Sequence, residues 1–181
     1  NSRKPVWRCL VCGEAGDWIA YLEKAKGYDF MMALQELAKA AGVELSPQSQ
    51  KAYQSYTKKA DILEAAHAYF QDILQEPETD REVFNYLADR GYLLDDIYDM
   101  ELGAYKDRQA LQDYLQQQGY TEQEIRETGL LTKGFGEDYK LTLLWRDAAG
   151  RAIGIVGRAI MPEDELKARG LPGKYKYSYD M

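Results

Sequence analysis

The chain has 181 residues and a formal net charge of −7, and an acidic balance taken alone argues against a nucleic-acid-binding protein. No run of about 18 apolar residues is present, so we expect no membrane-spanning helix, and two cysteines are too few for a disulfide-rich secreted protein. The acidic excess lies within residues 51–133, which leaves both ends of the chain able to present local positive surface.

The two cysteines form the first motif of the chain. Cys9 and Cys12 lie three positions apart and Gly13 follows them, the spacing of a zinc knuckle in which both sulfurs face one ion and the glycine permits the turn. A knuckle supplies only half of a tetrahedral site, so we expect the other two ligands upstream and a chain that lacks its start. The alternative is a thioredoxin-like redox pair, which requires the cysteines to follow a strand at the start of a helix.

Trp7 and Arg8 immediately precede the knuckle. An aromatic ring beside a cation suits the bases and phosphates of a single strand, so both residues are candidates for nucleic-acid binding. The alternative for Trp7 is simple packing against the knuckle.

Two helices are predicted after the knuckle. Asp17 can cap a helix that ends near Gly27. The second carries apolar residues at three-to-four spacing from Phe30 and stops at Gly42. We therefore predict a metal-dependent unit over residues 1–45, followed by a helical linker over 46–60 that begins with the cap-then-proline pair Ser46-Pro47.

The middle of the chain is predicted to be helical. An apolar stripe from Ile62 to Leu74 indicates an amphipathic helix that Pro77 ends, and the single histidine, His67, is expected in a core or surface role on it. Thr121 and Glu124 form a capping box. The expected helices run over 61–75, 80–89, 95–100, 107–118 and 121–129, with a brief strand or turn over 102–105.

The last third changes to strand patterns. Residues 139–145 and 151–160 are predicted to form an antiparallel hairpin joined by a turn at 147–150. A charged loop over 162–170 then leads to a strand at 174–177. These elements predict an α+β fold: a partial zinc ribbon with two helices, then a mixed helical and antiparallel-sheet subdomain over residues 61–181.

Four segments carry a resemblance to a known family. They are the knuckle and its two helices, the helix at 61–75 with Tyr86-Leu87-x-x-Arg90-Gly91, the segment Trp145-Arg146-Asp147-x-x-Gly150-Arg151-x-Ile153-Gly154-x-x-x-Arg158, and Lys174-Tyr175. In this order they resemble the second half of the zinc ribbon and the amino-terminal polymerase subdomain of bacterial DnaG-type DNA primases. The matching residues of the first segment are Trp7, Cys9, Cys12, Gly13, Gly16, Asp17, Gly27, Phe30, Ala33, Leu34, Leu37 and Ala38.

The resemblance implies which side chains contact DNA. Arg90 is expected to face the template and primer, although a cation before a glycine also suits a helix end. Arg158 matches a functional arginine of the family. Lys174, Tyr175 and Lys176 alternate cation and ring, a pattern that suits phosphate contact and stacking and equally an edge strand guarded by lysines.

The resemblance also implies cofactors and partners. Cys9 and Cys12 would hold structural zinc with an upstream pair of ligands, and magnesium would be bound only by a TOPRIM domain that this chain lacks. The complete protein would be a nucleotidyltransferase that makes RNA primers in DNA replication, so this fragment would bind single-stranded DNA and the RNA primer and have no activity alone. A replicative helicase is a further expected partner, no membrane is expected, and the cytoplasm is the expected location.

Three departures from the family pattern leave other functions open. The upstream Cys-x-x-His pair is absent, the approach to the hairpin at residues 136–140 has only Lys140 as a basic residue, and Lys176-Tyr177-Ser178-Tyr179 replaces the usual Leu-Asn-Ser-Pro. One alternative is a non-catalytic module whose acidic helices dock a replication protein. Another is the amino-terminal part of a primase–helicase.

Overall fold

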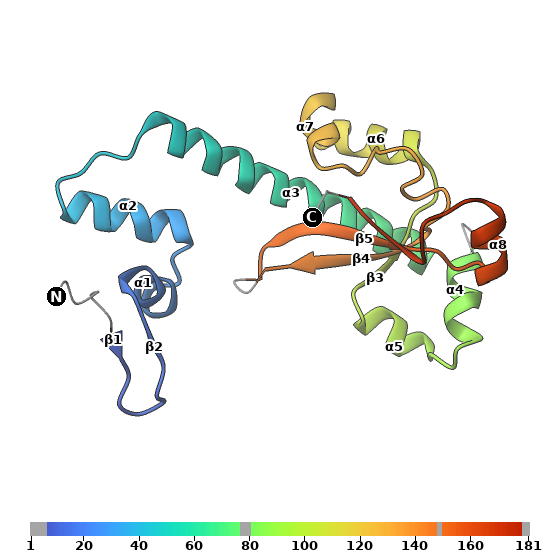
Figure 1. Cartoon of the computed structure of the whole chain (residues 1–181), viewed down its shortest axis with the longest axis horizontal. Helices are drawn as coiled ribbons and strands as arrows, with labels where there is room; N and C mark the ends of the chain where they lie inside the picture. Colours follow the sequence, from blue (N-terminus) through green and yellow to red (C-terminus); the bar gives the residue numbers. More distant parts are fainter. Residues whose placement is uncertain (1–6, 77–80, 148–149, 179–181) are drawn as a thin grey trace. The chain divides into compact units, whose positions relative to one another are not determined.

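The computed structural model describes residues 7–76, 81–147 and 150–178. It divides into two compact units, within Asn1–Ser55 and Tyr56–Met181, and Figure 1 labels most of their helices and strands. The boundary lies inside one helix, α3 (Pro47–Gln75), so the predicted linker over 46–60 forms the first part of a continuous helix. The predicted helix end at Pro77 lies outside the described residues.

The first unit contains a short hairpin and two helices. β1 (Trp7–Arg8) pairs antiparallel with β2 (Ala15–Gly16), and α1 (Trp18–Lys26) and α2 (Phe30–Ala40) follow. Asp17 caps α1 by accepting a hydrogen bond from the Ala20 amide at 2.9 Å, and Gly27 ends it in the left-handed region. Both predicted helices are therefore present, and α1 has the predicted caps, whereas the N-cap of α2 is Asp29, which was not predicted.

The core of this first unit is small. Leu22, Met31 and Ala33 are its buried apolar residues within the described part of the chain. Phe30, which begins the predicted apolar stripe of α2, is 43% exposed, because the helix directs Met31 and Ala33 inward instead. So little buried apolar surface agrees with a unit that needs a metal to fold.

The second unit is organised around an antiparallel sheet with the order β3-β4-β5-β6. The register pairs Leu141 with Arg158, and Arg158 with Tyr175. The helices and antiparallel strands confirm the predicted α+β class. The strands are β3 (Leu102–Ala104), β4 (Leu141–Arg146), β5 (Ala152–Arg158) and β6 (Tyr175–Tyr177).

Helices cover the two faces of this sheet unequally. The face that carries Ile155 packs against α3, α6 (Arg108–Gln117) and α7 (Glu122–Glu127) in one core cluster. The opposite face carries Leu141 and Leu143, which pack against α4 (Arg81–Ala88) and α5 (Leu94–Asp99) in a second cluster. Leu141 and Leu143 lie on the same face as Trp145, Arg158 and Tyr175 because side chains alternate along paired strands.

One detail of the second unit differs from the sequence predictions. The segment predicted as a charged loop contains a helix, α8 (Glu163–Ala168), whose buried Leu166 packs against Tyr139 and Ala159. Three acidic residues in its first turn interact favourably with the helix dipole and stabilise this helix. The sequence prediction took the high charge of the segment as a sign of a loop and missed this local signal. Within the described residues, no helix is both long and apolar enough to cross a membrane.

Candidate nucleic-acid interface and zinc knuckle

The knuckle is a tight turn between β1 and β2. The amide of Cys9 donates to the Glu14 carbonyl at 2.7 Å and the amide of Gly13 donates to the Cys9 carbonyl at 3.1 Å, while Gly13 takes a φ of 77° that favours glycine. Hydrogen bonds from the backbone amides of Cys12 and Val11, together with the Cys12 thiol, lower the pKa of the Cys9 thiol. A thiolate stabilised by amides on a turn suits zinc.

The surroundings of Cys9 and Cys12 argue against a redox pair. Both thiols are reduced and neither residue begins a helix, because α1 starts only at Trp18. Within residues 7–76, 81–147 and 150–178 no group of three His, Cys, Asp or Glu residues is placed to hold a metal. The two cysteines are therefore suited to act as two ligands of a larger zinc site.

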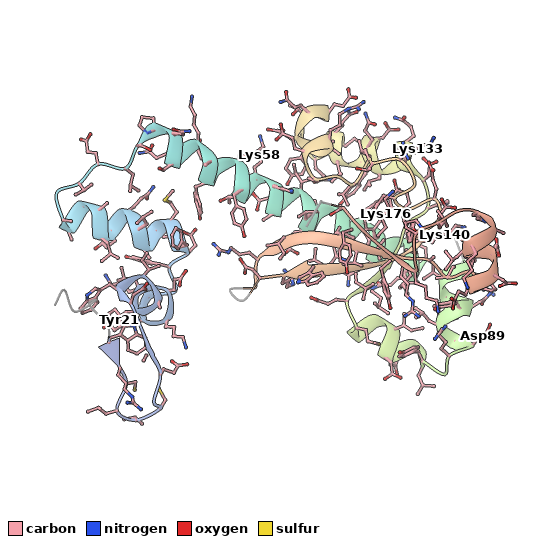
Figure 2. The ribbon with its side chains drawn as sticks, viewed as in Figure 1. Tyr21, Lys58, Asp89, Lys133, Lys140 and Lys176 are labelled. Atoms are coloured by element: carbon pink, nitrogen blue, oxygen red, sulfur yellow. The ribbon has the colours of Figure 1, made fainter. Side chains whose placement is uncertain are left out.

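Trp7 is largely committed to packing. Its ring lies edge-on to Tyr21 at 5.6 Å between centroids and beside Gly16, where an added Cβ would lie 3.3 Å from the Trp7 Nε1. Arg8 is exposed on β1. Within the described part of this unit, the exposed aromatic side chains are Trp18 (46%), Phe30 (43%) and Tyr21 (40%), the last of them labelled in Figure 2; none was among the predicted site residues.

Three of the predicted residues meet on one face of the second unit. The Arg90 guanidinium lies over the Tyr86 ring at 4.5 Å, and the Arg158 guanidinium lies 5.7 Å from Tyr86 and 5.5 Å from Tyr175. We call Arg90, Tyr86, Arg158 and Tyr175 the cation–aromatic row. Its geometry follows from local rules, because residues 86 and 90 are four apart at the end of α4 and Arg158 pairs with Tyr175 across the sheet.

The two arginines of the row differ from other arginines of this unit in having no carboxylate partner among the residues that the structure describes. In the described part of the chain neither Arg90 nor Arg158 forms an ion pair, and the Arg158 Nε is buried without a hydrogen-bond acceptor. Five other arginines of this second unit form ion pairs with an Asp or Glu carboxylate. The paired ones are Arg108, Arg126, Arg146, Arg151 and Arg169.

The two lysines of β6 and its approach have different positions. Lys174 is exposed and its Nζ lies 3.8 Å from a Glu163 carboxylate oxygen. Lys176 lies on the opposite face, where its Nζ donates to the Lys133 carbonyl at 2.7 Å. Figure 2 labels Lys176 and Lys133. The structure thus brings Arg90, Arg158 and Tyr175 together and separates Lys176 from them.

Tyr86 is the member of the row that was not predicted as a site residue. It is partly buried against the α4–α5 core, and it contacts both arginines. Its spacing of four from Arg90 was the available signal, but that signal does not say that Arg158 lies on the other side of the ring.

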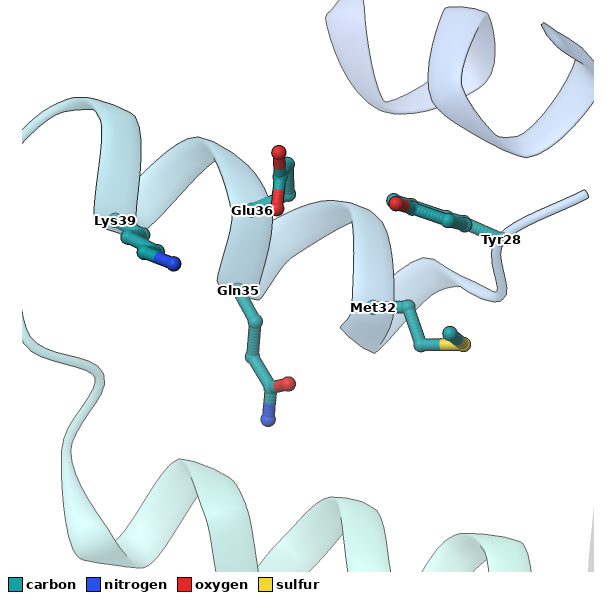
Figure 3. A pocket seen from close by; sticks show the side chains of 5 residues that line it. All are labelled: Tyr28, Met32, Gln35, Glu36 and Lys39. Atoms are coloured by element: carbon teal, nitrogen blue, oxygen red, sulfur yellow. The ribbon is translucent and has the colours of Figure 1, made fainter. Parts of the chain in front are cut away.

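A hollow in the first unit offers no comparable chemistry. It measures about 250 Å³ and is lined by Tyr28, Met32, Gln35, Glu36 and Lys39. Figure 3 shows these side chains around an open surface of α2. Because Glu36 and Lys39 have opposite charges, the hollow has no net attraction for a phosphate.

Two families match this chain. Residues 1–54 match the CHC2 zinc finger family, and residues 69–179 match the family described as DNA primase catalytic core, N-terminal domain. The second match alone covers more than half of the chain. The zinc-finger match agrees with the turn, spacing and thiol chemistry of Cys9 and Cys12.

Curated relatives extend well beyond the matched region. The DNA primase of Clostridium acetobutylicum is 29% identical over 172 residues, which cover 88% of this chain and 28% of that protein. The DNA primase of Thermotoga maritima is 27% identical over 165 residues, which cover 88% and 29%. The chain therefore spans less than a third of the length of these relatives.

Solved structures share the fold. The zinc-binding and RNA polymerase domains of the Aquifex aeolicus primase align with a TM-score of 0.54 and 24% identity, covering 98% of this chain and 42% of that one. A DnaG primase catalytic domain bound to single-stranded DNA aligns with a TM-score of 0.54 and 20% identity, covering 71% and 39%. At these identities the likeness establishes the architecture of both units.

Proposed function

This chain belongs to the DnaG-type DNA primase family, and on that premise we propose that it holds a single-stranded DNA template for RNA primer synthesis. The cation–aromatic row is the proposed contact surface. Its arginines would bind phosphates, and Tyr175, which is 50% exposed, would contact a base or sugar.

The observation that carries this proposal is that, among the described residues, no carboxylate forms an ion pair with Arg90 or Arg158. An arginine held near aromatic rings and without a carboxylate keeps its full charge for a ligand, and its planar donors match phosphate oxygens. The relative bound to single-stranded DNA adds support by its fold.

The zinc knuckle has a second part in the proposal. Cys9 and Cys12 would hold zinc together with two ligands outside the printed sequence, since tetrahedral sites need four and the chain's single histidine, His67, is buried in the other unit. Zinc analysis of a chain extended upstream should find one ion per molecule, and Cys12→Ser should lose it. An extended chain without zinc would contradict this part.

Catalysis is proposed to lie outside this chain. In the whole protein a TOPRIM domain would bind magnesium and perform nucleotidyl transfer, while this segment positions the template and the growing RNA primer. We place the protein in the cytoplasm, with a replicative helicase as a partner.

Fluorescence anisotropy with a short oligo-dT at several salt concentrations tests the template contact. With Arg90, Arg158 and Lys174 as the phosphate-binding cations, the logarithm of the binding constant should fall with the logarithm of salt with a slope of about −2. Arg158→Ala should weaken binding and reduce that slope by about 0.7. Arg126→Ala is the matched control, because Arg126 is exposed on α7 and paired with Glu122.

The contrary result is equally clear. No binding at low salt, or equal losses in the Arg158 and Arg126 variants, would refute a template contact at the row. Such a result would favour the docking module, in which acidic helices bind another replication protein.

A further inference from the structure

A groove continues the face that carries the cation–aromatic row. It has a volume of about 370 Å³, and its lining includes Leu143, Trp145, Val156, Tyr175 and Tyr177. By the strand register these five residues project from the same face of β4, β5 and β6. We call this hollow the Trp145 groove.

Two aromatic rings form its walls. The ring centroids of Trp145 and Tyr177 lie 5.8 Å apart, with 50° between their planes, and Trp145 is 41% exposed. Gly154 pairs with Trp145 in β5 and adds no side chain between β4 and β6 at this level. Leu143 and Val156 contribute apolar surface below the rings. The result is an open aromatic site with an apolar floor.

Tyr175 connects this groove to the row. The same ring lines the groove and contacts the Arg158 guanidinium at 5.5 Å. A ligand that binds Arg158 through a phosphate would therefore have its neighbouring unit beside Trp145 and Tyr177. The chemistry that alternates anionic groups with flat apolar rings is that of a nucleic acid strand.

We propose that the Trp145 groove receives an unpaired base of the single-stranded DNA whose phosphates contact the cation–aromatic row. This inference rests on the proposed template contact and adds a base-binding site to it. An unpaired strand is required, because duplex bases are already stacked, and stacking on aromatic side chains tolerates any base sequence. Duplex DNA should therefore bind without using the groove.

The fluorescence of Trp145 gives a direct test. The chain has three tryptophans, so the double variant Trp7→Phe, Trp18→Phe leaves Trp145 as the single reporter. Oligo-dT should quench it by stacking, whereas a strand of the same length with abasic sugars, which keeps the phosphates, should leave it unchanged.

Affinity measurements complete the test. Trp145→Ala should weaken oligo-dT binding roughly 5- to 150-fold, the range for one stacked base, without changing the salt slope or the affinity for the abasic strand. Trp145→Leu keeps apolar contact without the ring and should show most of the same loss. Tyr92→Ala is the matched control, since Tyr92 is 39% exposed and lies outside the groove and the row.

The outcomes separate the two proposals. Binding that depends on Arg158 but not on Trp145, without quenching, would overturn the base-binding groove and leave the template contact intact. Absence of any binding would overturn both. A Trp145→Ala effect on self-association in sedimentation analysis, with DNA binding unchanged, would assign the groove to contact between copies and also overturn the inference.

Discussion

Gly129, just after α7, packs closely against Ser178, the residue that follows β6. It follows the end of α7 with a φ of 78°, and a Cβ built on it would lie 1.2 Å from the Ser178 carbonyl oxygen. Gly119 is in the same position after α6, with a φ of 93°, yet its Cβ would meet no described atom within 4 Å. Substituting alanine at Gly119 therefore tests backbone strain alone, whereas substituting alanine at Gly129 tests strain together with the clash against Ser178.

The expected losses of stability differ in size. Gly119→Ala should cost about 1–2 kcal/mol, the strain of a left-handed alanine. Gly129→Ala adds overpacking against backbone, about 1–3 kcal/mol. It also displaces Ser178, whose amide donates to the Ile155 carbonyl at 2.9 Å and whose Oγ accepts from the Ile155 amide at 3.0 Å. Each bond contributes about 1 kcal/mol, so Gly129→Ala should cost at least about 2 kcal/mol more than the control.

Urea unfolding followed by Trp145 fluorescence measures this difference. In the Trp7→Phe, Trp18→Phe background the fluorescence signal comes from the second unit alone. Unfolding of the first unit therefore does not contribute to the measured transition. Gly129→Ala should also weaken oligo-dT binding because Ser178 adjoins β6, whereas Gly119→Ala should not. Equal losses in the two variants would refute the reasoning that Ser178 fills the space at Gly129.

Three further changes test the caps and the buried histidine. Thr121→Ala removes the side chain that accepts from the Glu124 amide, and in urea titration it should lower the free energy of unfolding by about 1 kcal/mol; an unchanged midpoint would contradict the cap. Hydrogen bonds from Lys58 and from the Thr121 amide lower the pKa of Glu124 from 4.5 to about 2. Stability should therefore be lost as pH falls from 4.5 toward 2, and Glu124→Gln should flatten that part of a stability–pH profile. Burial lowers the pKa of His67 below 6.5, so the unfolded chain binds its proton first as pH falls. His67→Leu should abolish this loss of stability below pH 6.5, and an unaltered profile would show that His67 is not its source.

Helix boundaries followed from the sequence where capping chemistry is local. Asp17 and Gly27 bracket α1 as expected, and the Thr121–Glu124 capping box begins α7. These signals involve residues within one turn of each other, so they need no tertiary information. The continuation of α3 through the predicted linker is a different case, because a polar stretch gives no sign of whether the helix is interrupted there.

Within the site, strand alternation was more informative than composition. Lys174, Tyr175 and Lys176 read as one cationic run, but the pleat places Tyr175 with Arg158 and sends Lys176 to the Lys133 carbonyl on the other face. That separation was deducible only with the register between β5 and β6, which depends on long-range pairing. The roles proposed for these residues remain predictions.

The arginines show why net charge taken alone is a weak argument against a nucleic-acid-binding protein. An excess of acidic residues argues against binding DNA only if the negative charge is spread evenly. Here carboxylates distant in sequence neutralise particular arginines: Glu64, for example, lies 82 residues from the Arg146 that it pairs with. Arg90 and Arg158 contact aromatic rings instead and form no ion pair within the described residues. A few uncompensated cations in an acidic protein should bind single-stranded DNA weakly and with a shallow salt slope. Contacts with the bases must then supply part of the affinity. The Trp145 groove is the site that we propose for one such base.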